Sequence, residues 1–353
     1  RLPNGIKGLS ERIEAMGIKF GLWFEPEMTN KDSDLYRAHP DWILHTPGRN
    51  ASHGRYQYVL DFSRKEVVEY IYEMIAKILS EAKVSYIKWD MNRSITECYS
   101  VALPADRQGE VFHRYILGVY NLYERLTSEF PEVLFESCSS GGGRFDPGML
   151  YYAPQGWTSD DSDAIERLKI QYGTSLCYPI SSMGSHVSVI PNHQVFRKTP
   201  LHTRANVAYF GTFGYELDLN SLKEEEIAEV KEQIIFMKKY RKLFQFGDFY
   251  RLKSPFEGNE TIWMVVSEDK KTAIVGYYRT LNGVNQAYSR IKLQGLDPDM
   301  LYENILNKTE NYGDELMNFG LITTDVTAGE VPGDATPCTD FESRIYILKA
   351  KEK

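Results

Sequence analysis

Short apolar strands alternate with amphipathic helices through most of the first 240 residues, and this alternation constrains the fold more than any other feature of the chain. Strands separated by such helices predict βαβ units and a parallel sheet, hence the α/β class. The expected strands are residues 18–24, 56–60, 84–89, 133–136, 156–159 and 179–183. Such a sheet is either open and doubly wound or closed into a (β/α)8 TIM barrel.

Three helices carry recognisable terminal signals. Ser63 with Glu66 forms a capping-box pattern, Pro131 ends a helix expected over residues 109–129, and Ser221 with Glu224 begins a third helix. The expected buried stripes are Val67, Ile71, Ile75 and Ile78 in the first helix, Phe112, Ile116, Val119, Leu122 and Leu126 in the second, and Ile227, Val230, Ile234 and Met237 in the third.

Acidic residues at the ends of the expected strands favour the barrel over the open sheet. No GxGxxG or GxxxxGK[ST] fingerprint occurs, which makes a nucleotide-dependent dehydrogenase remote. Barrel enzymes gather their chemistry at the carboxyl ends of several strands. The residues at these ends are Glu25, Glu27, Asp61, Asp90, Glu136, Asp160 and Asp161. A barrel needs eight strands and only six are recognised, so we expect the first two to precede Arg1 and the chain to be a fragment of a longer protein.

The pattern changes after Phe246 to short β-rich runs separated by turns, which predict a separate antiparallel β-sandwich. The expected strands are residues 261–266, 273–278, 288–293 and 344–348. We therefore expect a partial catalytic barrel over residues 1–245 and a C-terminal β domain over residues 246–353.

Composition excludes several classes of partner. The net charge of -8 comes from 41 basic and 49 acidic residues spread along the chain, so we expect no nucleic acid partner. No apolar run approaches the roughly 20 residues needed to cross a bilayer, so we expect no membrane association. The four cysteines, Cys98, Cys138, Cys177 and Cys338, are widely separated and the histidines lack metal-ligand spacing. We expect no metal site and a reducing, cytoplasmic setting.

One strand ends in a candidate nucleophile. Lys88, Asp90 and Asn92 occupy alternate positions, which places an ammonium, a carboxylate and an amide on one side of the strand. Lys88 would keep Asp90 ionised, as a glycosidase nucleophile requires. The alternative is an ion pair that merely closes the strand end.

Three carboxylates crowd the next strand-to-helix turn. Asp163 is in position to cap the helix that follows, which leaves Asp160 and Asp161 as candidates for a general acid. Like charges held close together raise at least one pKa, and a protonated carboxyl can then donate a proton near neutral pH. Together with Asp90, either residue would complete the two-carboxylate arrangement of glycoside hydrolysis.

A glycine-rich turn follows the strand that ends at Glu136. Its glycines suit close approach to a ligand, either a phosphate or sugar hydroxyls, although the Lys-Ser/Thr of a phosphate loop is absent. Cys138 is either a catalytic thiol or a small buried contact residue. Arg55 is free to reach a ligand hydroxyl or a carboxylate, although on sequence alone an arginine in this position is more often a surface salt-bridge partner.

These segments together resemble the microbial α-galactosidases (melibiases) of glycoside hydrolase family 36. The motifs are FGLWFEPEM from Phe20, KWDMNR from Lys88, CSSGGGRFD from Cys138, WTSDDSDAIERL from Trp157, SMGSHVS from Ser182 and YGDELMNFGL from Tyr312. The resemblance runs the whole length of the chain. Full-length members also carry a large N-terminal β domain and a paired-aspartate motif, neither of which is found here.

The resemblance implies a retaining exo-α-galactosidase that acts on melibiose and raffinose-type oligosaccharides without a cofactor. It assigns Asp90 as the nucleophile and Asp160 as the acid/base, with carboxyl groups about 5 to 5.5 Å apart in a retaining enzyme. The residues it places against the substrate are Arg55, Lys88, Trp89, Asn92, Cys138, Gly141 and Trp157. It also implies a homotetramer.

Other functions remain open at this point. Within the family, an α-N-acetylgalactosaminidase or a galactosyl transferase would differ near the 2-hydroxyl, where Cys138 and Gly141 favour a plain hydroxyl. From another class, the chain could be a noncatalytic galactoside-binding module. Aglycone preference is not predicted.

Overall fold

The computed structural model describes residues 2–284, 289–323 and 340–351. The chain divides into two compact units, residues 1–158 and 159–353, and each is described by itself. The boundary predicted at residue 245 falls inside the second unit and stays a prediction.

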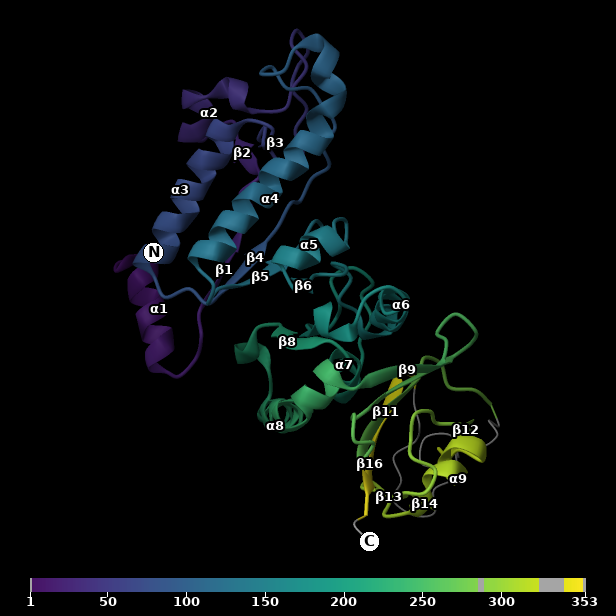
Figure 1. The fold of residues 1–353 in the computed structure, drawn as a ribbon. Helices are drawn as coiled ribbons and strands as arrows, with labels where there is room; N and C mark the ends of the chain where they lie inside the picture. The colour runs from purple at the N-terminus through teal and green to yellow at the C-terminus, as the bar shows by residue number, and fades with distance from the viewer. Residues whose placement is uncertain (1, 285–288, 324–339, 352–353) are drawn as a thin grey trace. The chain divides into compact units, whose positions relative to one another are not determined.

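A four-stranded parallel sheet forms the centre of the first unit (Figure 1). Its strand order is β1 (Gly21–Phe24), β4 (Tyr86–Trp89), β5 (Leu134–Ser137) and β6 (Gln155–Gly156). All three pairings are parallel, with Phe24 opposite Trp89 and Trp89 opposite Ser137. The carboxyl ends of these strands therefore meet at one edge, which is where Glu25, Asp90 and Cys138 follow in sequence.

Long helices pack on this sheet. The helices of the first unit are α1 (Gly5–Ala15), α2 (Asp34–Ala38), α3 (Lys65–Glu81), α4 (Val111–Glu129) and α5 (Pro147–Tyr152), with 3-10 turns η1 (Pro40–Trp42) and η2 (Ala105–Glu110). Figure 1 shows α3 and α4 side by side, and their apolar faces share one core with Ile87, Trp89 and Phe135.

The buried face of α4 differs from the expected one. Phe112 is 55% exposed, because the helix begins at Val111 and the buried stripe runs from Val111 through Tyr115, Val119, Leu122 and Leu126. A residue one position along a helix points about 100° away from its neighbour. The expected stripe therefore included Phe112, whereas the structure buries the adjacent Val111 in its place.

The strand predicted at residues 56–60 is real but does not join the parallel sheet. It is β3 (Gln57–Val59), which pairs antiparallel with β2 (Met28–Asn30) in a two-stranded sheet. The Ser63 cap was also wrong: Arg64 is the N-cap of α3, and the Ser63 hydroxyl donates to Asp61 instead. Asp61 also accepts from the Ser63 backbone N–H at 3.1 Å, so two hydrogen bonds hold Ser63 against Asp61.

Two parallel strands and three helices open the second unit. They are α6 (Ala164–Thr174), β7 (Gly184–Ser188), α7 (Leu201–Ala208), β8 (Thr212–Glu216) and α8 (Glu224–Phe246). The strand predicted at residues 179–183 was wrong, because the 3-10 turn η3 (Ile180–Ser182) occupies most of it and β7 follows. The strand β8 was missed, since none of its residues is fully buried and its apolar signal is weak.

The start of α8 was also misplaced. Ser221 belongs to the 3-10 turn η4 (Leu219–Ser221), and Lys223 is the N-cap. The Glu226 carboxylate accepts a hydrogen bond of 2.9 Å from the Lys223 backbone N–H, so the acidic first turn stabilises the start of the helix. Of the expected stripe, Val230 and Met237 are buried, whereas Ile227 is 37% exposed.

An antiparallel β domain ends the chain. Its six-stranded sheet has the order β14 (Glu310–Tyr312), β13 (Leu301–Asn304), β16 (Glu342–Ala350), β11 (Thr272–Arg279), β10 (Glu260–Val266) and β9 (Asp248–Lys253). A second pair joins β12 (Arg290–Ile291) to β15 (Leu321–Ile322), and α9 (Gly313–Asn318) packs nearby. Tyr288, in the strand predicted at residues 288–293, lies outside the described residues.

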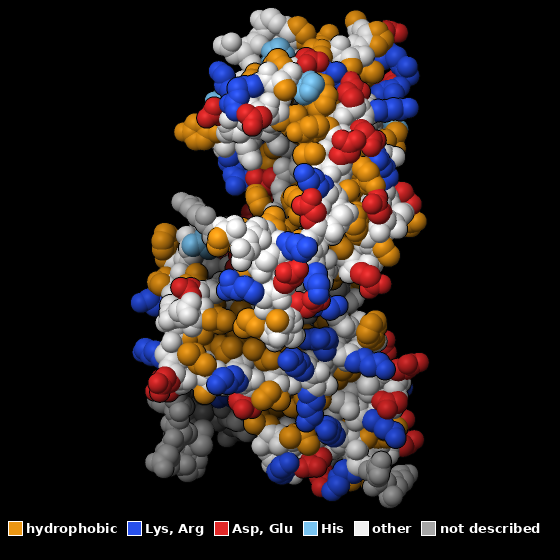
Figure 2. Space-filling view, turned by 90° about the vertical axis from the view of Figure 1, so that its left-hand side faces the viewer, with side chains coloured by type: hydrophobic (Ala, Val, Ile, Leu, Met, Phe, Trp, Pro, Cys, Tyr) orange, Lys and Arg blue, Asp and Glu red, His pale blue; other side chains and the backbone are white. Residues whose placement is uncertain are grey.

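The architecture is that of a (β/α) barrel followed by an antiparallel β domain, as predicted. Within the described residues six strands are parallel, four in the first unit and two in the second. In the same part of the chain, no helix combines the length and the apolar character needed to cross a bilayer. Acidic and basic side chains are interspersed on the face shown in Figure 2.

Candidate active site

Asp90 follows directly after β4 at the carboxyl edge of the parallel sheet. Its side chain is buried, with the residue only 6% exposed. The indole Nε1–H of Trp23 donates to Oδ2 at 3.2 Å, and the backbone N–H of Met91 donates to Oδ1 at 2.9 Å. Trp23 lies opposite Lys88 in the β1–β4 pairing and is itself half exposed.

Hydrogen-bond donors keep Asp90 ionised. Burial alone would raise the pKa of this carboxyl, but hydrogen bonds from Cys138, Asn92, Trp23 and the Met91 backbone outweigh burial and hold the pKa below its ordinary value. An ionised carboxylate in a largely dry setting is a competent nucleophile.

Cys138 acts as a donor in this cluster. Burial, and then the hydrogen bond to Asp90, raise the pKa of its thiol to about 12. A thiol with that pKa stays protonated at neutral pH, which is the opposite of what a nucleophilic cysteine requires. The reading of Cys138 as a buried contact residue is therefore favoured, and the catalytic-thiol reading is not.

Lys88 forms its ion pair with a different carboxylate from the one expected. Its ammonium lies 3.1 Å from Oε1 of Glu136 in β5 and 4.3 Å from the centroid of the Trp157 ring. The largest causes of the lowered Asp90 pKa are neutral donors, and the expected role of Lys88 in ionising Asp90 stays a prediction. Strand register places Lys88 opposite Glu136 in the parallel β4–β5 pair.

Glu136 is held on its other side by two polar residues. Tyr86 and Gln155 both donate to Oε2, and Gln155 also donates to the Tyr86 hydroxyl at 3.1 Å. Burial, followed by the charge of Glu136, raises the pKa of Tyr86, so the phenol remains a donor. Glu136 is thus a fixed anchor for the Lys88 ammonium.

Glu25 connects two of the predicted substrate contacts. It follows β1, and its side chain is only 9% exposed. Oε1 accepts from Arg55 Nη1 at 3.0 Å and from Asn92 Nδ2 at 2.5 Å, while Gln57 donates to Oε2 at 2.9 Å. The salt-bridge reading of Arg55 is confirmed, although its partner lies in the candidate site.

The glycine-rich turn closes tightly behind this cluster. Gly141 has a φ of +83°, a conformation that side chains rarely adopt, and a Cβ on Gly142 would come 2.5 Å from the Thr158 carbonyl oxygen. Ser140 donates to the Asn92 side-chain oxygen at 3.3 Å. The glycines thus allow the backbone to approach the residues after β4.

Arg144, at the end of the same turn, forms an ion pair with the fully buried Glu27. It donates to both oxygens of Glu27, at 2.8 and 2.9 Å, and Trp89 and Tyr115 donate to the same carboxylate at 2.8 and 2.5 Å. Burial raises the pKa of Glu27, but Arg144 and these donors more than reverse the effect and leave it lowered.

The structure does not bring Trp89 to the candidate site. It is fully buried, stacks on Tyr123 at 4.2 Å between ring centroids, and donates to Glu27. Successive side chains of a strand point to opposite faces, so Trp89 and Lys88 face opposite sides. The substrate-binding prediction for Trp89 is therefore corrected to a core role.

The 160–163 turn lies in the second unit. Asp163 caps α6 by accepting from the backbone N–H groups of Ile165 and Glu166, as predicted, and is also paired with Arg197. Asp161 accepts from the Asp163 backbone N–H at 3.1 Å. Asp160 is exposed. Because Asp161 and Asp163 stabilise the turn itself, the exposed Asp160 is the better acid/base candidate.

The buried Arg167 stabilises this turn through hydrogen bonds. Arg167 is 2% exposed, and it donates to the backbone oxygens of Ser159 and Gly184 and to the Gln171 side chain. Burial lowers the pKa of Arg167 to about 10. Within the described residues, no group of three or more His, Cys, Asp or Glu side chains could hold a metal ion.

Three functional candidates were missed from sequence. Trp23 lies in a quoted motif without an assigned role, and Glu25 and Glu136 were noted only as strand-end acids. The signal available was position, because each lies at or next to the carboxyl end of a parallel strand. Their contacts depend on register between strands, which one sequence does not reveal.

Family models match almost the whole chain. The model described as Melibiase matches residues 1–247, and the model described as Glycosyl hydrolase family 36 C-terminal domain matches residues 260–348. Among curated proteins, alpha-galactosidase AgaA of Geobacillus stearothermophilus is 56% identical over 355 residues, covering 100% of this chain and 47% of its own length. Alpha-galactosidase Mel36A of Lactobacillus acidophilus is 47% identical, covering 99% and 46%.

Solved structures agree with these matches. The crystal structure of Geobacillus stearothermophilus AgaA has a TM-score of 0.93 and 53% identity, covering 99% of this chain and 47% of its own. An alpha-galactosidase from Lactobacillus brevis has a TM-score of 0.95 and 50% identity, covering 99% and 47%. The chain therefore spans about half the length of the curated relatives it matches.

Proposed function

Because this chain belongs to the melibiase family of glycosyl hydrolases, family 36, we propose that the protein is a retaining exo-α-galactosidase. The single observation that carries the proposal is Asp90: a buried carboxylate at a barrel strand end, kept ionised by four donors. Relatives named alpha-galactosidases support the activity, and AgaA variants crystallised with raffinose and stachyose support α-galactoside oligosaccharides as substrates.

In the proposed reaction Asp90 attacks the anomeric carbon while protonated Asp160 donates its proton to the departing oxygen. The glycosidic bond breaks as the covalent galactosyl-enzyme bond forms. Asp160, now a carboxylate, takes a proton from water, and that water displaces Asp90 to release galactose with its configuration retained. No cofactor enters either step.

The other residues of the cluster bind and orient the sugar. Lys88, Asn92 and Arg55 supply donors to hydroxyl groups, and the half-exposed indole of Trp23 offers an apolar face beside Asp90. Cys138 and Gly141 leave room for a plain 2-hydroxyl.

Hydrolysis of p-nitrophenyl α-galactoside, with the product anomer followed by NMR, tests the proposal. The protein is extended to the length of its relatives, with Asp90→Asn and Asp160→Asn as variants. We expect α-galactose first and a loss of at least about 10³-fold in kcat for Asp90→Asn. Asp106→Asn, the same change at an exposed position of the turn η2, is the matched control. A folded parent without turnover would favour the noncatalytic module, and β-galactose first would exclude retention.

We also propose a cytoplasmic homotetramer. The family resemblance supports the tetramer, and the free thiols of Cys98, Cys138 and Cys177 support a reducing compartment; Cys338 lies outside the described residues. Light scattering of the extended protein and fractionation of its host cells test the two parts, and a monomer or a secreted protein would refute them.

A further inference from the structure

Asp160, the proposed acid/base, is exposed, but the turn that carries it is held by buried neighbours. Ser162 and Asp163 are both buried. The Ser162 carbonyl oxygen accepts from the Ser188 hydroxyl at 2.9 Å, and Nδ2 of Asn192 donates to the Ser162 hydroxyl oxygen at 3.4 Å. The position of Asp160 therefore depends on residues at the end of β7 and in the segment that follows it.

Arg197, in the segment after β7, holds the end of this turn through two carboxylates. Its guanidinium is paired with Asp163, the N-cap of α6, and its Nη2 lies 3.2 Å from Oε1 of Glu166 in the first turn of that helix. The backbone N–H of Asn192 donates to the Arg197 carbonyl oxygen at 2.9 Å, which closes the segment into a loop. Arginine has a planar fork of donors, so two bound carboxylates fix its orientation. Arg197 thus ties this loop to the turn that carries Asp160.

Arg197 also contacts an aromatic ring of the β domain. Its guanidinium carbon lies 5.5 Å from the ring centroid of Phe341, the residue directly before β16. A cation within about 6 Å of a ring centroid is attracted by the ring. Contacts therefore run without a break from the β domain through Arg197 to Asp163.

The backbone of Phe341 has a conformation that phenylalanine rarely adopts. Its φ is +60°. The Thr203 hydroxyl in α7 donates to its carbonyl oxygen at 2.8 Å, and its own N–H donates to the Thr280 carbonyl oxygen at 3.0 Å. Strained residues persist where the surrounding structure fixes them, and they cluster at functional sites. These two hydrogen bonds hold Phe341 in the conformation that brings its ring to Arg197.

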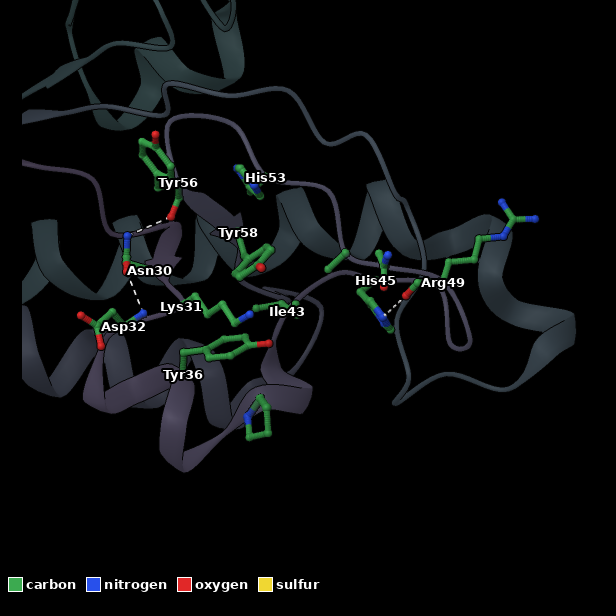
Figure 3. A pocket seen from close by; sticks show the side chains of 13 residues that line it. Asn30, Lys31, Asp32, Tyr36, Ile43, His45, Arg49, His53, Tyr56 and Tyr58 are labelled. Atoms are coloured by element: carbon green, nitrogen blue, oxygen red, sulfur yellow. Dashed lines mark hydrogen bonds between the residues drawn. The ribbon is translucent and has the colours of Figure 1, made fainter.

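Positive φ alone does not mark a functional aromatic residue. Tyr56 and Phe196 have φ angles of +61° and +56°. They are 77% and 78% exposed, and Figure 3 shows the Tyr56 ring beside a pocket of the first unit. Phe341 is half-buried, and its ring contacts a cation. The contact with Arg197 is therefore the feature that points to a role for Phe341.

We propose that Arg197 is a positioning residue for the acid/base Asp160, and that Phe341 of the β domain holds Arg197 in place. The inference rests on the proposed function. It gives the β domain a part in the transfer of the Asp160 proton to the departing oxygen. Loss of either contact should weaken acid catalysis and leave the attack by Asp90 intact.

Two leaving groups separate acid catalysis from other effects. p-Nitrophenolate departs with little help from an acid, whereas the sugar released from raffinose needs a proton as the bond breaks. The values of kcat/KM for p-nitrophenyl α-galactoside and raffinose are measured in the protein extended to the length of its relatives. Poor positioning of the acid lowers the raffinose value and spares the other.

Two variants each weaken one contact. Arg197→Lys keeps the charge and loses the fork that holds Asp163 and Glu166, and Phe341→Asn removes the ring while suiting the positive φ. We expect kcat/KM for raffinose to fall about tenfold in Arg197→Lys and about threefold in Phe341→Asn, with p-nitrophenyl α-galactoside changed less than about twofold. Phe196→Asn, the same change at an exposed phenylalanine with a similar φ, is the matched control. Equal losses on both substrates, or no loss on raffinose, would overturn the proposal.

A double-mutant cycle shows whether Arg197 acts through Asp160. In the Asp160→Asn protein, Arg197→Lys should cause no further loss on raffinose, because the group that Arg197 positions is already absent. An additive loss would mean that Arg197 acts on the reaction by another route, and it would refute the positioning role.

Hydrogen exchange measured by mass spectrometry needs no turnover. We expect the amides of residues 157–166 to exchange at least about threefold faster in Phe341→Asn than in the parent, with no change in Phe196→Asn. Unchanged exchange in Phe341→Asn would refute the inference. This measurement decides on the positioning role even if the parent hydrolyses neither substrate, which is the result that would refute the proposed function.

Discussion

The ammonium nitrogen of Lys88 lies 3.1 Å from Oε1 of Glu136, its partner across two parallel strands. The pairing fixes the direction of a side chain that would otherwise sample many rotamers. Glu136 itself touches no residue with a proposed covalent role, so it is a positioning residue.

Glu136→Gln keeps the shape of this anchor and removes its charge. We expect kcat/KM for p-nitrophenyl α-galactoside to fall about tenfold, mainly through KM, because the Lys88 ammonium loses its ionic partner. Glu132→Gln, an exposed acid just before β5, is the matched control. Unchanged kinetics in a variant with the parent's melting temperature would contradict the positioning role.

Glu25→Gln should act on substrate binding through two residues at once. The variant weakens the acceptor shared by Arg55 and Asn92, so we expect KM to rise about tenfold while kcat changes less. Glu14→Gln on α1 removes the exposed ion pair with Lys83 and should change neither KM nor kcat. A fall in kcat at constant KM would mean that Glu25 has a different role.

Cys138→Ala should move the acid limb of the pH–rate profile. The wild-type donors hold the pKa of Asp90 below its ordinary value, so the nucleophile stays ionised well into the acid range. Loss of one donor raises that pKa, and we expect the acid limb of kcat/KM to move up by about half to one pH unit. Cys98→Ala, at a second free thiol, is the control. An unmoved limb would show that the thiol does not stabilise the Asp90 carboxylate.

Arg144→Met should destabilise the fold and reverse the local pH dependence. Glu27 stays buried without its cation, which costs about 3 to 5 kcal/mol. In the parent the pKa of Glu27 is lowered, so its contribution is present at neutral pH and is lost as the pH falls through that pKa. In the variant the pKa rises above the unfolded value, so the deficit should shrink on acidification. Denaturant unfolding of the parent and the variant at pH 5 and pH 7.5 measures the loss in the free energy of unfolding. An equal loss at both pH values would contradict this account.

Much of the fold could be predicted because the spacing of apolar residues within one helix or strand can be seen in its own sequence. The strands β1, β4 and β5 carry apolar residues, of which Ile87, Trp89 and Phe135 are buried, and α3 and α4 have strong apolar stripes. The strand β8 has no fully buried residue and was missed. The strand β3 was found, but the sequence pattern did not show that it pairs with β2. Pairing is set by tertiary packing, which does not appear in one strand's own pattern.

For the candidate site too, the sequence predicted some of the residues but not the contacts between them. Asp90, Asn92, Cys138 and Gly141 follow strand ends and were found from sequence, and Asp163 was recognised as a cap. The partners of these residues were not found, because Lys88 could face either Asp90 or Glu136 until the strand register was known. The separation of the Asp90 and Asp160 carboxyl groups stays a prediction.

Arg55 and Tyr56 form a turn in which both residues have positive φ angles, +52° and +61°, a backbone conformation that favours Asn-Gly. Selection for heat resistance alone should replace both residues with Asn-Gly, since relieved backbone strain raises stability at little risk to the fold. Selection for growth on α-galactosides should retain Arg55, whose guanidinium donates to Glu25 in the candidate site. Variant libraries passed through both regimes would therefore diverge first at these two positions, with thermal tolerance gained in one population and substrate use kept in the other.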